Sequence, residues 1–460
     1  MKVFLLSPPV SLQPLKLFPR HPPLLSAQLA AVLRSMGHRV QVLDAFLLRL
    51  GAEDVVRTLL AAAPDAVVVL PNDVARETPP EVAAGLAAAY RAAGGKAPMW
   101  VAGVGNGKWL RDLLDLAPGL SGALVGDPEP ALPELLAGGE TPGLILPGAG
   151  TLPEPGVVES LDALPLPAWD LFDLRSYVVL PHRRGRGLEY PLLASRGCWW
   201  NRCLFCQDLA CVKSSRYRVR SPEHVVEEME WAAKRFRARH FLFHDAVFPA
   251  RREWLARFAD ELEQRRLEVT WFCMTRADAV DAEVLRAMRK AGCRNVCFGL
   301  ESGDDDMLRR MDKGHDTTAS LRAVQEARDA GLEVSATFVL GFPGETPRQA
   351  GRTAEFAASL GLDYAQFLLV KWHQVPRDLL SAGTLVEEWD LAQYDYRGMV
   401  FVPDSYGSLA RLKLARTYAY VRFYLRPAYL LRTTTKLRSK GDIRRYLAGA
   451  ATLARAMLNR

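Results

Sequence analysis

The sequence predicts an α/β protein with three parts: a doubly wound parallel sheet, a partial barrel of six strand–helix units, and a helical C-terminal region. Three observations predict this fold. Short apolar runs alternate with amphipathic stretches in two separate blocks of the 460-residue chain, a proline-rich segment divides the blocks, and amphipathic stretches of helical period follow the second block. Continuous apolar strands that alternate with helices are typical of parallel sheets whose faces are covered.

The first block, residues 1–145, has the pattern of a doubly wound sheet. Apolar runs of strand length are followed by amphipathic stretches of helix length. Sheets of this kind bind ligands beyond the carboxyl ends of their strands. We expect strands at 3–7, 39–43, 66–70, 99–102 and 123–125, and helices at 24–36, 52–62, 80–93 and 129–136.

Residues 146–189 indicate a connection between two domains, because prolines cluster there and regular periodicity is lost. Within this connection, residues 161–171 are expected to lie across a neighbouring domain.

The strand–helix alternation returns over residues 190–371, and six units of this size favour an open or partial barrel. Residues 372–460 are expected to be helical. The expected strands are 192–195, 240–243, 268–272, 295–300, 333–339 and 364–370, and the expected helices begin near 222, 251, 281, 317 and 346.

Composition limits the class of protein. Hydrophobic residues make up 49% of the chain and charged residues 24%, which is typical of a soluble globular protein. No apolar run approaches the roughly 20 residues of a membrane-spanning helix, and the first residues are a poor signal peptide, so we expect a cytoplasmic protein. Residues 411–460 hold one acidic residue, Asp442, among many basic ones. They predict either a surface for an acidic partner or, as we favour, the solvated face of terminal helices; nucleic acid is not an expected partner.

Cysteines are the strongest sign of chemistry. Seven in a chain of this length argue against a disulfide scaffold, and Cys198, Cys203 and Cys206 share one short loop after the first strand of the second block. A four-iron cluster bound by only three thiolates keeps one iron free for another ligand. The alternative is a zinc site with Cys211 as fourth ligand. The remaining cysteines are expected to be small buried side chains: Cys273, Cys293 and Cys297.

Residues 192–370 resemble the radical S-adenosylmethionine (radical SAM) superfamily. Besides the cysteine loop, segments 240–245, 298–303 and 339–346 match that family's motifs in order, with the typical 311–315 between the last two. The resemblance implies a 4Fe–4S cluster bound by the three cysteines and S-adenosylmethionine bound beside it. It implies contacts to S-adenosylmethionine from Phe205, Asp245, Glu301, Gly341 and Gly344.

Each supporting motif also has a simpler interpretation. Asp245 could cap the following helix, Glu301 could cap the next turn, and residues 341–344 could be an ordinary turn. The spacing of the first two cysteines departs from the family, because four residues (199–202) separate them where three are usual. The extra residue leaves the geometry of the loop open, but not the identity of the ligands.

The first block resembles the cobalamin-binding module that precedes many radical SAM domains. Its opening Ser-Pro-Pro, residues 126–129, and the bridge at 161–171 carry the likeness. There is no Asp-x-His-x-x-Gly motif, so no histidine is placed to bind cobalt from below, and a module without a corrin is the alternative. The implied cobalamin contacts are Asn72, Gly103, Gly105 and Gly126.

These patterns predict a cobalamin-dependent radical SAM C-methyltransferase. A radical SAM cyclase, rearrangement or oxidation enzyme is one alternative, and a non-catalytic iron–sulfur or zinc protein is another. The expected partners are a small-molecule or peptide substrate and a low-potential electron donor such as flavodoxin or ferredoxin. Substrate could be met near the last strand, at Tyr364, Gln366, Lys371, Trp372 and His373, where packing against the C-terminal helices is an equally good interpretation.

Overall fold

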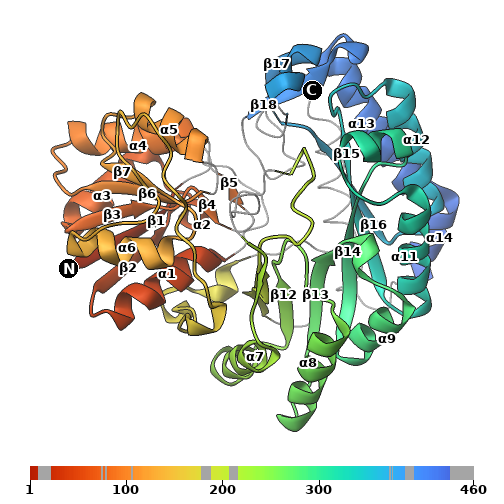
Figure 1. The fold of residues 1–460 in the computed structure, drawn as a ribbon, viewed down its shortest axis with the longest axis horizontal. Coiled ribbons are helices and arrows are strands. Elements are labelled where there is room, and N and C mark those ends of the chain that lie inside the picture. Colours follow the sequence, from red (N-terminus) through yellow and green to blue (C-terminus); the bar gives the residue numbers. More distant parts are fainter. Residues whose placement is uncertain are drawn as a thin grey trace.

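Two six-stranded sheets form the frame of the protein, one from the N-terminal third and one from the middle of the chain (Figure 1). The structure is a computed structural model. It describes residues 1–8, 22–73, 76–77, 80–104, 107–177, 188–206, 216–371, 375, 377–388 and 398–435.

The first sheet has the strand order β2-β1-β3-β6-β7-β8, in which all neighbours are parallel except β7 and β8. The order reverses at β1, so the carboxyl ends of β1 and β3 flank the place where such sheets bind ligands. The strands are β1 Lys2–Ser7, β2 Arg39–Asp44, β3 Ala66–Val69, β6 Met99–Val104, β7 Gly122–Val125 and β8 Leu144–Ile145.

Helices cover both faces of this sheet because its strand residues alternate between two cores. In β1, Phe4 and Leu6 join the core under α3–α5, whereas Val3 and Leu5 join the core under α1 and α6. The helices are α1 Leu24–Ser35, α3 Ala52–Ala62, α4 Pro80–Ala92, α5 Gly107–Leu116 and α6 Pro128–Ala137, with a short α2 at Ala45–Leu48 and a small ribbon of β4 Asn72–Asp73 and β5 Arg76–Glu77.

The second sheet is fully parallel and its strands follow chain order. Among the described residues its first and last strands are not paired, so the sheet stays open. The strands are β9 Glu189–Leu192, β12 His240–Phe243, β13 Thr270–Thr275, β14 Cys293–Glu301, β15 Glu333–Leu340 and β16 Tyr364–Leu369.

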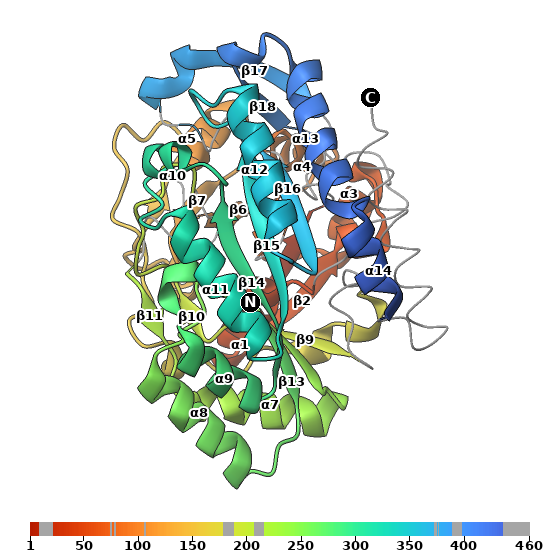
Figure 2. The ribbon, with the colours of Figure 1, turned by 90° about the vertical axis from the view of Figure 1, so that its right-hand side faces the viewer.

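The helices that follow these strands pack on one face of the sheet (Figure 2). Polar side chains begin several of them: Asp281 accepts from the backbone of α9, and Thr346 with Gln349 forms a capping box on α12. The helices are α7 Pro222–Phe236, α8 Arg252–Gln264, α9 Ala282–Lys290, α11 Thr317–Asp329 and α12 Pro347–Ser359. The short α10 Asp305–Arg310 packs elsewhere, since its Met307 lies in a cluster with Cys203 and Phe205.

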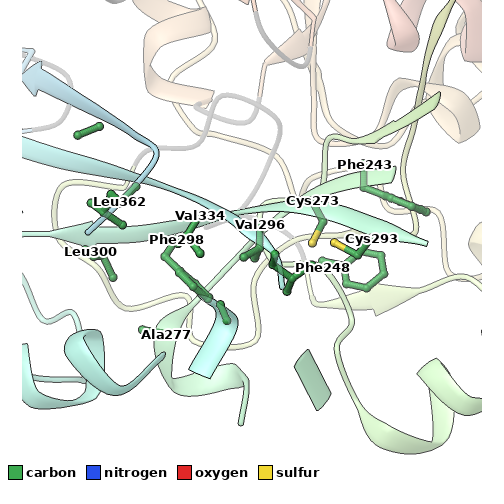
Figure 3. Packing of buried hydrophobic residues seen from close by; sticks show 14 of the residues in the cluster. Phe243, Phe248, Cys273, Ala277, Cys293, Val296, Phe298, Leu300, Val334 and Leu362 are labelled. Carbon is green, nitrogen blue, oxygen red and sulfur yellow. The ribbon is translucent and has the colours of Figure 1, made fainter. Parts of the chain in front are cut away.

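The core between this sheet and its helices is aromatic and contains two of the cysteines outside the loop. Cys273 and Cys293 lie beside Phe243 and Phe248 (Figure 3). Together with Cys297 they are in the reduced form and at most 4% exposed, so the expectation of buried hydrophobic cysteines is confirmed. Side chains at alternate positions, such as Leu242 and Phe272, form a separate cluster on the opposite face.

The connection between the sheets lies across α1, as expected. The Ala168 amide donates to Ala27 O at 2.9 Å, and Gln28 donates to Pro165 O at 2.7 Å. Trp169 is fully buried and packs edge-on against Tyr190 of β9 with ring centroids 5.9 Å apart. The connection therefore joins the helices of the first sheet to the core of the second.

Three predictions of secondary structure need correction. The first strand of the second block is 189–192 and not 192–195, because the polar residues that follow form a separate ribbon. Helices α5 and α10 lie in segments for which no helix was expected.

The C-terminal region is not wholly helical. It contains an antiparallel ribbon of β17 Gly383–Glu388 and β18 Gly398–Pro403 before helices α13 Leu409–Tyr424 and α14 Pro427–Thr435. Tyr420 and Tyr424 of α13 donate to backbone oxygens of β16, at 3.3 and 2.9 Å. None of the helices in the described ranges is long and apolar enough to span a bilayer.

Candidate functional site

The cysteine loop leaves the second sheet on a short ribbon. β10 Ser195–Arg196 pairs with β11 Arg218–Val219, and the cysteines follow directly after β10. Gly197 has φ +85°, and a side chain there would meet Arg216 O at 3.0 Å. Asn201, within the four-residue spacing, also has a positive φ of +44°. The longer spacing is therefore accommodated by a left-handed residue in the loop.

The segment after α10 holds this loop in place. The Trp200 indole N–H donates to Asp312 O at 2.8 Å, and the Leu204 amide donates to Met311 O at 2.9 Å. Arg202 pairs with the Asp312 carboxylate at 3.1 Å. The typical motif at 311–315 thus serves as the support of the cysteine loop.

The three loop cysteines are in the reduced form, and two of them, Cys203 and Cys206, belong to an apolar cluster. Cys203 is 7% exposed and packs, with Cys206 and Phe205, against Met307, Met311, Val339 and Phe342. Burial raises the pKa of the Cys203 thiol, while the nearby cations Lys313 and Arg276 act in the opposite direction. Cys198 is also close enough to act on this pKa.

The arrangement of these thiols bears on the two metal hypotheses. Among the described residues, no three His, Cys, Asp or Glu side chains converge on a single-ion site. The thiolates of an iron–sulfur cluster need not meet at one ion, because they bind a multi-iron centre. Cys211, the fourth ligand of the zinc hypothesis, lies outside the described residues.

Lys313 contacts both Glu301 and Phe205, two residues that were predicted from separate motifs. Glu301 is 6% exposed and pairs with Lys313 Nζ at 2.9 Å, and the same ammonium group lies 5.9 Å from the centre of the Phe205 ring. Glu301 sits at a break in the register between β14 and β15 and has φ +65°. A positive φ in a non-glycine residue stores backbone strain, which is common where a side chain is aimed at a ligand.

Asp245 makes different contacts from a helix cap. Its carboxylate accepts from the Ala194 amide at 3.1 Å and from the Ser195 hydroxyl at 2.5 Å. Burial raises the pKa of Asp245 to about 7, although these hydrogen bonds act to lower it. Asp245 therefore fixes the ribbon that carries the cysteine loop.

The glycine motif after β15 ends in a buried acid. Gly341 and Gly344 have φ values of +84° and +78°, which favour glycine. The Gly341 amide donates to Glu345 Oε2 at 2.5 Å, and the Tyr406 hydroxyl donates to the same oxygen at 2.8 Å. Val339 and Phe342 of this motif contact the cysteine cluster, so the structure brings 339–345 and 198–206 together.

Four residues of this region were not predicted as site residues. The signal for Lys313 and Glu345 was present, since both belong to motifs that the sequence offered. Arg276 could have been found by inspecting the residue after each strand of the second sheet. Tyr406 gave no signal, because it reaches Glu345 from a segment 61 residues away.

Three of the four candidate cobalamin residues lie within the described ranges. Asn72 lies in β4, and Gly105 lies outside the described residues. Gly103 lies in β6, one residue before the end of the strand, and has φ +78°. Gly126 has φ +90°, and a side chain there would come within 2.3 Å of Gly156 O, so close packing of the chain already requires glycine at this position.

The acidic residues after Gly126 join the first sheet to the cysteine loop. Arg196 pairs with Glu129 at 2.6 Å and with Asp127 at 3.1 Å. Arg218, the partner of Arg196 across the ribbon, pairs with Asp127 at 2.5 Å. This buried cluster ties the carboxyl edge of β7 to the residue two positions before Cys198.

The family comparison matches residues 192–357 to a single model, described as the radical SAM superfamily. Residues 192–357 belong to the radical SAM superfamily. The matched radical SAM region contains the three loop cysteines, Asp245, Glu301 and the glycine motif.

Two curated relatives align with the radical SAM region and part of its surroundings. One is an uncharacterized methyltransferase of Pyrococcus horikoshii, 29% identical over 60% of this chain and 59% of that protein. Another is the anaerobic magnesium-protoporphyrin IX monomethyl ester cyclase of Rubrivivax gelatinosus, 27% identical over 64% of this chain and 51% of that one. The chain thus spans less than two thirds of the length of these relatives.

Two solved structures share the fold over most of the chain. TsrM from Kitasatospora setae, a radical S-adenosylmethionine methyltransferase, superposes with a TM-score of 0.69 over 93% of this chain and 90% of its own, at 19% identity. OxsB, a cobalamin-dependent S-adenosylmethionine radical enzyme, gives a TM-score of 0.68 over 99% and 71%, at 15% identity. The likeness extends beyond the radical SAM domain to the first sheet.

Proposed function

We propose that this protein is a cobalamin-dependent radical SAM methyltransferase that acts on an unactivated carbon of its substrate. The observation that carries the proposal is the loop of three reduced cysteines, which packs against the glycine motif and, through Lys313, lies beside Glu301. The finer description of the fold belongs to the same proposal: a Rossmann-like cobalamin-binding domain at 1–145, a linker at 146–189, a partial (β/α)6 barrel at 190–371 and a C-terminal region at 372–460.

Cys198, Cys203 and Cys206 would hold a 4Fe–4S cluster. When bound, the cluster supplies one electron that cleaves S-adenosylmethionine to methionine and a 5′-deoxyadenosyl radical. The part of the chain is to bind the cofactor, orient it and exclude water. The apolar cluster around Cys203 provides that exclusion, because Phe205, Met307 and Phe342 surround the thiol.

Phe205, Asp245, Glu301, Gly341 and Gly344 are proposed to line the S-adenosylmethionine site. Support comes from Lys313, which neutralises Glu301 and sits over the Phe205 ring. The two glycines allow the left-handed turn that carries this motif past the cysteine loop. Asp245 would position the cysteine loop at this site. Its carboxylate accepts hydrogen bonds from the Ala194 amide and the Ser195 hydroxyl, just before Cys198.

Cobalamin is proposed to bind at the carboxyl edge of the first sheet, which faces the cysteine loop through the Arg196 ion pairs. Asn72, Gly103, Gly105 and Gly126 remain the proposed contacts. The strand order of the sheet supports a ligand at this edge. So does the fold shared with TsrM, a structure of which is described with cobalamin and a 4Fe–4S cluster bound.

The name of one relative supports a second candidate function, a radical reaction that closes a ring. One relative is named a cyclase, so ring formation without methyl transfer is the alternative. Product mass distinguishes the two, because methylation adds one carbon and cyclisation does not.

The proposed function requires a reducing compartment for the thiols and a protein that donates electrons to the cluster. Reduced thiols such as those of Cys198, Cys203 and Cys206 suit the cytoplasm, where a flavodoxin or ferredoxin can supply electrons of low potential. A small molecule or a peptide is the proposed substrate.

The test is an oxygen-free purification in which iron, sulfide and corrin are measured together. The proposal expects about four irons and one corrin per chain, and formation of 5′-deoxyadenosine under strong reductant. An intact cluster that produces no 5′-deoxyadenosine would favour a non-catalytic iron–sulfur protein, and zinc in place of iron would refute the proposal.

A further inference from the structure

Arg276 is a buried cation beside the proposed cluster ligands. It follows β13 directly, and its side chain is 4% exposed. Its guanidinium group lies 5.2 Å from the Trp199 ring centre and 4.9 Å from that of Trp200. A cation near the face of an indole is attracted by the ring, more strongly where water is excluded.

Hydrogen bonds fix the direction of this guanidinium group. Nε and Nη2 donate to the two carboxylate oxygens of Asp278 at 2.8 and 2.7 Å, and Nη2 also donates to Lys313 O at 2.5 Å. The remaining nitrogen, Nη1, lies 3.8 Å from Cys203 Sγ. Because Nε and Nη2 donate to Asp278 and Lys313, the orientation of the guanidinium group is fixed. Nη1 is therefore held toward Cys203 Sγ.

A fixed donor on a ligand sulfur changes the energetics of an iron–sulfur centre. Reduction adds a negative charge, and a hydrogen bond or a cation at the sulfur stabilises the reduced form more than the oxidised one. The reduction potential therefore rises. Asp278 opposes this effect, since its carboxylate neutralises much of the charge of Arg276.

We propose that Arg276 is a positioning residue which, clamped by Trp199 and Trp200, sets the reduction potential of the cluster held by Cys203. The inference rests on the proposed function and deepens it. The electron concerned comes from a low-potential flavodoxin- or ferredoxin-type donor, and Arg276 gains and loses no atom in the transfer.

This role also accounts for the unusual spacing of the first two cysteines. The four residues between them contain both indoles, and Asn201 turns the chain through a left-handed conformation directly after them. Trp200 is anchored separately by its N–H group on Asp312 O. The longer loop thus supplies two aromatic faces that hold Arg276 against Cys203.

The test is an EPR-monitored redox titration of the reconstituted protein with dithionite. Arg276→Gln should make the potential more negative and Asp278→Asn should make it less negative. Each shift is expected to reach at least a tenfold change in the reduced-to-oxidised ratio at a fixed potential, which is about 59 mV for one electron. Arg252→Gln is the matched control: Arg252 also pairs with an aspartate, Asp281, at 2.7 Å, but its side chain is 48% exposed and it lies at the start of α8.

Shifts of opposite sign, with iron content unchanged and the control unmoved, would support the proposal. Equal potentials in the unaltered protein and both variants would overturn it, as would shifts of the same sign. If Arg276→Gln loses iron, Asp278→Asn decides alone, because it keeps Arg276 and the size of the side chain. Failure of the unaltered protein to hold a cluster would overturn the proposed function itself.

Discussion

Arg196 forms an ion pair with Glu129 at 2.6 Å, and this contact joins the cysteine loop to the first sheet. The Glu129 side chain is 1% exposed and that of Arg196 is 13% exposed. Both charges are thus removed from water at a boundary between two parts of the chain that fold on separate sheets. The contact links the site proposed for the cluster to the edge proposed for cobalamin.

Breaking this ion pair should destabilise the apoprotein strongly. Arg196→Gln leaves the buried Glu129 carboxylate without its cation, whereas Asp127 keeps its pair with Arg218. The expected loss is about 3–5 kcal/mol, the cost of removing one partner of a buried pair. A double-mutant cycle with Glu129→Gln, measured by denaturant unfolding, should return a favourable interaction energy for the pair. The control is the exposed pair Arg34–Asp170, whose interaction energy should not exceed about 1 kcal/mol. Additive effects of the two buried substitutions would contradict the coupling.

Replacing Cys203 should separate the two proposed cofactors. Cys203→Ala removes a ligand thiol and is expected to abolish cluster loading and cleavage of S-adenosylmethionine. Corrin affinity should stay largely unchanged, because the described residues that pack with Cys203 follow the first sheet in the chain and belong to the second sheet, its loops and the C-terminal region. Iron, sulfide and corrin content of oxygen-free preparations measure both outcomes. Cys297→Ala, at a buried cysteine outside the loop, is the control that should keep its iron.

Glu345 should make stability depend on pH. Burial raises its pKa to about 7, so the folded chain holds a proton that the unfolded chain releases near the ordinary value of 4.5. The unfolded state then binds fewer protons than the folded state between those values, and stability falls as pH rises from about 4.5 to 7. Its Oε1 has no hydrogen-bond partner among the described residues, which adds to the penalty of ionisation.

Thermal unfolding from pH 4.5 to 7.5 measures this effect. Glu345→Gln keeps the acceptor for Gly341 and Tyr406 but does not titrate, so its unfolding temperature should fall less across this range. Glu355→Gln is the control, because Arg422 and Tyr418 lower the pKa of Glu355 and its contribution is lost only in more acidic solution. Parallel pH profiles for Glu345→Gln and the unaltered protein would refute the assignment.

Local sequence predicted those features that depend on neighbours in the chain. Strand β12 and the cysteine loop were readable because apolar runs and ligand spacing are local patterns. The Glu301–Lys313 pair joins two recognised motifs, yet nothing in either motif indicates that they meet. Arg276 and Tyr406 act through contacts over 73 and 61 residues, which no periodicity records.

The ribbon of β17 and β18 was also not predicted, because it too depends on contacts beyond the local sequence. Each strand is six residues long and lies in a region whose overall pattern is amphipathic and helical. Their pairing depends on contacts between the two strands, and Phe401 of β18 further donates its amide to Val370 O after β16. Tertiary packing therefore overrides the helical pattern here.

The last prediction concerns Gly126, whose two possible roles can be separated by stability alone. Gly126 and Gly37 have similar positive φ values, +90° and +82°, so alanine at either position pays about 1–2 kcal/mol for the left-handed backbone. At Gly37 the added methyl group meets no atom within 4 Å, whereas at Gly126 it would lie 2.3 Å from Gly156 O. Gly126→Ala should therefore cost about 1–3 kcal/mol more than Gly37→Ala in denaturant unfolding of the corrin-free protein. Equal losses would show that the chain tolerates a side chain at 126, and a glycine there would then be explained better by a bound ligand than by packing.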